Sequence, residues 1–103
     1  MTEFERVTAR LVDQLSHWTP SRWAASSASG GTRAEVVHGL VQQVADLAAG
    51  AEGQPHRPVP RLAADLSLPD QLRVVAADLL AARPEPAVLA RATELVTRTR
   101  RNL

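Results

Sequence analysis

Residues 32–50 read TRAEVVHGLVQQVADLAAG, and this stretch decides the fold because it carries the clearest helix signals in the chain. Thr32 and Glu35 have the spacing of a capping box, in which each side chain binds the free backbone N–H of the other residue. Apolar residues then recur every three or four positions, as on one face of a helix, and the pattern ends near Gly50. We therefore predict a helix over about 33–49 with one buried face.

The N-terminal residues repeat the same start signal. Thr2 and Glu5 have capping-box spacing, which predicts a helix over about 3–18. One apolar stripe then contains Phe4, Val7, Leu11, Leu15 and Trp18. In "TPSRW", Thr19 is placed to cap an extra turn that carries Trp23 back toward the other helices. The following "SSASGG" predicts a flexible gap without regular structure.

After residue 50 the pattern changes to a proline-containing stretch. Residues 50–66 hold prolines at 55, 58 and 60, which disfavour helix and predict an extended, semi-rigid crossover. Ser67 as cap and Pro69 in the first turn predict a third main helix over about 68–82, and Pro86 opens a fourth over about 86–100.

Four apolar helix faces and no alternating strand pattern predict an all-α protein. With 103 residues, the chain fits one domain, residues 1–103. The expected architecture is a small antiparallel four-helix bundle with a long proline-containing crossover between the second and third of the four main helices. A dimer that completes the core is the alternative.

Composition restricts the classes of function. The chain has no cysteine, which excludes disulfides, a thiol nucleophile and thiolate metal sites. Its first residues resemble neither a signal peptide nor a membrane span, so we expect a cytoplasmic protein without membrane contact. All 12 basic residues are arginine, which suggests a high-GC bacterial genome. The basic character comes from the tail with Arg98, Arg100 and Arg101, so nucleic-acid binding through the tail is only a second alternative function.

No residues have the spacing of a nucleophile with its base, of paired catalytic carboxylates or of a complete metal site, so no catalytic residue is predicted. A candidate ligand or partner site instead lies at one end of the expected bundle, where antiparallel neighbours bring together His17, Trp18, Trp23, Glu35 and His38. Trp18 continues the apolar stripe, whereas Trp23 is free to line a groove. His38 and His17 could contribute to a divalent metal site, although zinc needs a third or fourth ligand.

The order of an amphipathic helix, a tryptophan in a short turn, a polar gap and then "TRAEVVHGL" resembles the start of the DinB and mycothiol-dependent maleylpyruvate isomerase-like superfamily over residues 4–49. The resemblance implies a four-helix bundle, often dimeric, with His38 as one ligand of a divalent metal. The family's later metal histidines have no counterpart here, because no histidine follows His56.

The expected function is a small non-catalytic helical interaction module that binds a protein partner or a second copy of itself, with no cofactor. The alternative is a reduced DinB-like protein that binds a metal or small ligand near His38.

Overall fold

Three threonines start the helices of the N-terminal half, as the sequence predicts. The computed structural model describes residues 1–103, and in it α1 (Glu3–Leu15), α2 (Pro20–Ala24) and α3 (Arg33–Ala51) begin directly after Thr2, Thr19 and Thr32. Both predicted capping boxes are formed: each threonine hydroxyl accepts the backbone N–H of the glutamate three residues later, and each glutamate binds the threonine N–H. The first helix ends at Leu15, three residues earlier than expected.

Prolines mark the helix starts of the C-terminal half. A single 3₁₀ turn, η1 (Asp65–Ser67), leads into α4 (Leu68–Ala81), and Pro86 opens α5 (Pro86–Arg101). Ser67 does not cap α4, because its hydroxyl donates to the Ala64 carbonyl at 2.6 Å. The chain is therefore all-helical, with four long helices, one short helix and no strand.

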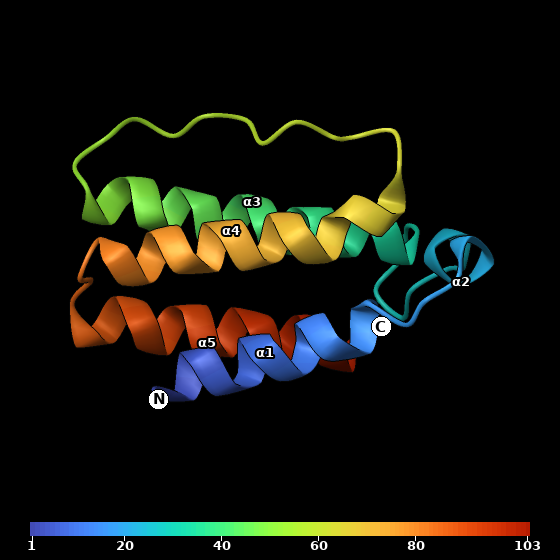
Figure 1. Cartoon of the computed structure of the whole chain (residues 1–103), viewed down its shortest axis with the longest axis horizontal. Helices are drawn as coiled ribbons and strands as arrows, with labels where there is room; N and C mark the ends of the chain where they lie inside the picture. Colours follow the sequence, from blue (N-terminus) through green and yellow to red (C-terminus); the bar gives the residue numbers. More distant parts are fainter.

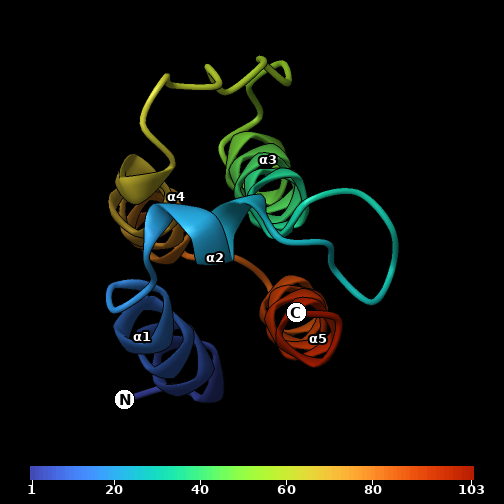
Figure 2. The same ribbon diagram turned by 90° about the vertical axis from the view of Figure 1, so that its right-hand side faces the viewer.

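The four long helices lie side by side, and α2 lies across one end of the group (Figures 1 and 2). Figure 1 shows that α3 and α4 run in the same direction, opposite to α1 and α5. The most extensive packing joins the parallel pair α3 and α4, and α1 packs against both α4 and α5. The uniformly antiparallel arrangement that the sequence predicts is therefore not observed.

The crossover explains this mixed arrangement. Helix α3 has 19 residues and is about 28 Å long at 1.5 Å per residue. Residues 52–64 contain no helix, and an extended chain of that length reaches about 40 Å. The crossover is thus long enough to return along the whole of α3 (Figure 1), so that α4 starts beside the start of α3.

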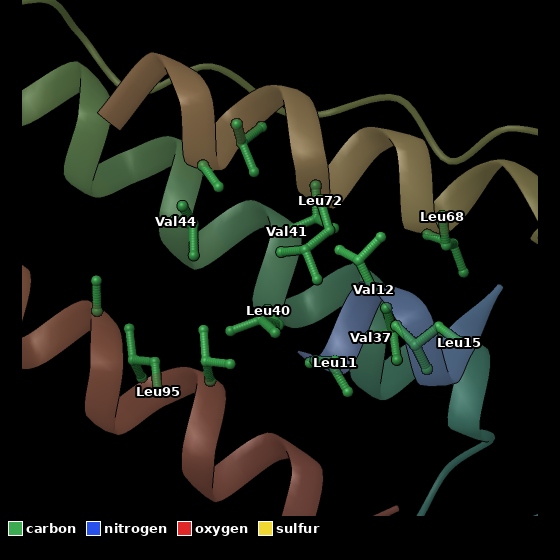
Figure 3. Close-up of a cluster of buried hydrophobic side chains, with 14 of the residues drawn as sticks. Leu11, Val12, Leu15, Val37, Leu40, Val41, Val44, Leu68, Leu72 and Leu95 are labelled. Carbon is green, nitrogen blue, oxygen red and sulfur yellow. The ribbon is translucent and has the colours of Figure 1, made fainter. Parts of the chain in front are cut away.

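One core joins all the helices. Leucine and valine side chains from α1, α3, α4 and α5 point into the space between them, as Figure 3 shows for Leu11, Leu40, Leu72 and Leu95. Twenty buried apolar residues form this single cluster.

The polar gap before α3 contains no helix or strand, as the sequence predicts, but backbone hydrogen bonds define its path. The backbone N–H of Arg33 donates to the Ala25 carbonyl at 2.9 Å, and that of Ser27 donates to the Gly31 carbonyl at 2.9 Å. Gly30 and Gly31 make the turn with φ values of +91° and +73°, which glycine adopts at little cost. The Ala28 N–H donates to the Asn102 carbonyl at 2.9 Å, so this loop also holds the end of α5.

No helix is long and apolar enough to pass through a membrane.

Candidate functional site

The two tryptophans form part of the core. Trp23 is completely buried and Trp18 is 6% exposed. Their rings meet edge to face, with centroids 4.9 Å apart and planes at 68°. The prediction that Trp23 lines a groove is wrong: the capped turn of α2 places its ring over the end of the core. The indole N–H of Trp23 has no hydrogen-bond acceptor.

Two arginines cover the Trp18 ring. The guanidinium carbons of Arg22 and Arg33 each lie 5.5 Å from the ring centroid, within the range of cation–π attraction. Arg33 also donates through Nε to the Leu103 carbonyl at 3.2 Å. These contacts join α2, the start of α3 and the C-terminal residues. No hollow in the surface is lined by Trp18 or Trp23.

His38 holds the crossover. Its Nε2 lies 3.0 Å from the Val59 carbonyl oxygen, as in a hydrogen bond in which the ring N–H donates. One turn further along α3, Gln42 accepts the Val59 N–H at 2.7 Å and donates to the Arg57 carbonyl at 3.0 Å. Gln71 of α4 donates to the Pro60 carbonyl at 3.0 Å. The part-buried His38 side chain is therefore a structural contact of the crossover.

The other predicted site residues do not join His38. His17 is exposed, and its Nδ1 lies 2.8 Å from the Asp13 carbonyl oxygen of its own helix. Glu35 completes the α3 capping box. The backbone N–H of Thr32, followed by the Thr32 hydroxyl and the charge of Arg61, lowers the pKa of Glu35. Nowhere do three or more histidine, aspartate or glutamate side chains come close enough together to hold a metal ion.

Two of the three arginines of the tail contact other side chains. Arg98 pairs with Glu94 one turn earlier on α5, and Arg100 donates to the Gln14 side chain of α1 at 3.3 Å. Arg101, the third predicted residue of the basic tail, is exposed at the last position of α5. One exposed hydrogen bond thus joins the last turn of α5 to α1.

A hollow that sequence reasoning missed lies between α1 and α4, and we call it the α1–α4 groove. It has a volume of about 460 Å³, and seven of its 12 lining residues are hydrophobic. The lining residues are Met1, Phe4, Glu5, Thr8, Ala9, Val12, Asp13 and Ser16 from the α1 side and Arg73, Ala76, Ala77 and Leu80 from α4. The signal in the sequence is the presence of alanine at positions 9, 76 and 77, whose small side chains leave the groove open.

The α1–α4 groove contains a buried polar atom without a partner and a highly exposed apolar side chain. The Thr8 side chain lies in its wall, 6% exposed, and the hydroxyl oxygen has no hydrogen-bond partner. Met1, at one end of the groove, is 88% exposed, the most exposed large apolar side chain of the chain. Three other hollows have similar volumes of about 410 to 470 Å³, but fewer of their lining residues are hydrophobic. A smaller hollow of about 300 Å³ lies where the crossover meets α4, beside the partly exposed Leu62 and Val74.

The chain matches no protein-family model, no curated protein and no solved structure.

Proposed function

We propose that the chain is a small helical interaction module, built as a four-helix bundle and without catalytic activity, that binds a protein in the α1–α4 groove. The observation that carries this proposal is the groove itself. It is open to solvent and mostly apolar, and its exposed lining residues include Ala9 of α1 and Ala77 of α4. An apolar depression bordered by polar residues is typical of a protein interaction site.

The shape of the groove favours a helix as the bound element. The groove runs between two antiparallel helices, and α1 alone has 13 residues, which is about 20 Å of length. An amphipathic helix placed between two helices buries its apolar face against both, and small residues such as Ala76 let it approach closely. The rim carries Glu5, Asp13 and Arg73, which provide charges to orient a partner.

The proposal assigns no metal, other cofactor or nucleic acid to the chain. A ligand site near His38 would need its ring to leave the Val59 carbonyl, and Trp23 would have to leave the core. Nucleic-acid binding through the tail would compete with the contacts that Arg98 and Arg100 make with Glu94 and Gln14. The groove requires neither change.

The test is site-specific photocrosslinking in the cells that make the protein. A photoreactive amino acid replaces Ala77 in the groove or, as the control, the exposed Ala90 on α5, which lines no hollow. We expect an adduct of discrete mass from position 77 and none from position 90. Ala9→Trp, which fills the groove from the α1 side, should abolish that adduct. Equal adducts from both positions, an adduct unaffected by Ala9→Trp, or no adduct at all would refute the proposal.

A further inference from the structure

The charges on the rim of the α1–α4 groove identify its occupant. We propose that the occupant is a second copy of this chain, related by a two-fold axis parallel to the helices, so that α1 of each copy lies against α4 of the other. This inference rests on the proposed function, since it names the partner of the same groove.

The two rims of the groove differ in charge. The α1 rim is acidic, with Glu5 toward one end and Asp13 toward the other, and the α4 rim carries Arg73. The Asp13 carboxylate makes no ion pair within the chain. Because α1 and α4 are antiparallel, Arg73 lies in the half of the groove that contains Asp13 and Ser16, and Leu80 lies in the half that contains Met1.

Of the two-fold axes parallel to the helices and across them, the parallel one pairs opposite charges. An axis parallel to the helices keeps every residue at its own level and places α1 opposite α4 of the other copy, so Arg73 faces Asp13 of the second copy twice. An axis across the helices places α1 opposite a reversed α1, so Glu5 faces Asp13 of the second copy twice. Like charges across an interface are unfavourable, and charge complementarity therefore selects the first arrangement.

The same arrangement covers the exposed alanines of the groove. Ala9 and Ala77 of one copy approach Ala77 and Ala9 of the other, and small side chains on both helices permit close packing. The patch is about 20 Å long and about 20 Å wide, so two copies bury on the order of 800 Å² in total, which is typical of weak, transient complexes. We expect weak association, detectable as the concentration of the chain approaches roughly millimolar.

Arg73 is available for this contact. Within the chain it donates to Asp70 at 2.7 Å, and both side chains are largely exposed. An exposed pair of this kind contributes little stability, and the guanidinium has further N–H donors for a second carboxylate.

The test is a charge exchange followed by sedimentation equilibrium. In Asp13→Arg both partners of the contact are positive, and in Arg73→Asp both are negative, so each variant alone should associate at least tenfold more weakly than the natural chain. An equimolar mixture restores opposite charges across both contacts and should regain association. Arg91→Asp, at an exposed position of α5 that lines no hollow, is the control and should associate like the natural chain.

Far-UV circular dichroism of each variant establishes that it is folded, which the exposure of both positions leads us to expect. A natural chain that stays monomeric up to millimolar concentration overturns the inference, and so does a mixture that associates no better than its two components. If either result occurs while photocrosslinking from position 77 still gives an adduct that Ala9→Trp abolishes, the groove binds a different protein and the proposed function stands. Loss of that adduct as well would remove both.

Discussion

Replacing Gln42 by alanine should release the crossover from α3. Gln42 makes two hydrogen bonds to the crossover backbone, to the Val59 N–H at 2.7 Å and to the Arg57 carbonyl at 3.0 Å, and a third to Asp46 at 2.9 Å. A hydrogen bond of this type contributes about 0.5–1.5 kcal/mol, so the two crossover bonds amount to about 1–3 kcal/mol. Part of this loss of stability is offset, because the variant has no glutamine side chain whose conformational entropy is lost on folding.

The adjacent Gln43 provides a matched control. It is exposed on the same helix and makes no side-chain hydrogen bond, so Gln43→Ala has the same effect on helix propensity without the loss of the crossover contacts. We expect Gln42→Ala to lower the free energy of unfolding by about 1–2 kcal/mol more than Gln43→Ala, measured by urea denaturation with circular dichroism.

Hydrogen exchange locates the effect. The backbone N–H of Val59 has Gln42 as its acceptor, so its exchange should become faster in Gln42→Ala and stay unchanged in Gln43→Ala. Equal losses of stability in the two variants, or an unchanged exchange rate for Val59, would show that the crossover is not held in this way.

Three further substitutions have definite expected outcomes. Trp23→Ala should cost about 3–5 kcal/mol in urea denaturation, because the ring is completely buried, and a loss below about 1 kcal/mol would contradict a core role. Arg83 follows the end of α4 and is the only non-glycine residue with positive φ (+50°). Glycine adopts this conformation more easily, so Arg83→Gly should raise the free energy of unfolding by about 0.5–1 kcal/mol. A lower melting temperature for the variant would contradict this expectation. Because Thr32 lowers the pKa of folded Glu35, the ionised carboxylate stabilises the protein above the unfolded pKa of about 4.3, and this stability is lost as pH falls through the lower folded pKa. Glu35→Gln keeps an oxygen acceptor but does not titrate. Its stability in urea titrations should therefore decline less steeply as pH falls below the unfolded pKa, and an unchanged slope would count against the assignment.

Local signals were sufficient to predict the helices. The capping boxes at Thr2 and Thr32, the Thr19 cap and the opening Pro86 depend on residues within one turn of each other, and the structure contains all of them. Ser67 is the exception, because the preceding 3₁₀ turn uses its hydroxyl for the Ala64 carbonyl.

Contacts between distant residues were not predictable in the same way. The direction of α4 depends on the path of the crossover, and that path depends on contacts of His38, Gln42 and Gln71 with backbone groups 11 to 21 residues away. Helix periodicity also places Trp23 on no particular face, because α2 has only five residues. The α1–α4 groove arises where small residues of two separate helices meet, which no single stretch of sequence reveals.

Thiol protection in cells tests the central claim most directly, since the chain contains no cysteine of its own. Ala77→Cys and Ala90→Cys each introduce one thiol at an exposed position, the first in the α1–α4 groove and the second outside every hollow. The rate of alkylation is compared between the cells that make the protein and dilute purified protein. We predict that the thiol at position 77 reacts more slowly in cells than in dilute solution, whereas the thiol at position 90 reacts equally fast in both. Equal reactivity of the position 77 thiol in both settings would contradict the claim that the groove is a binding surface.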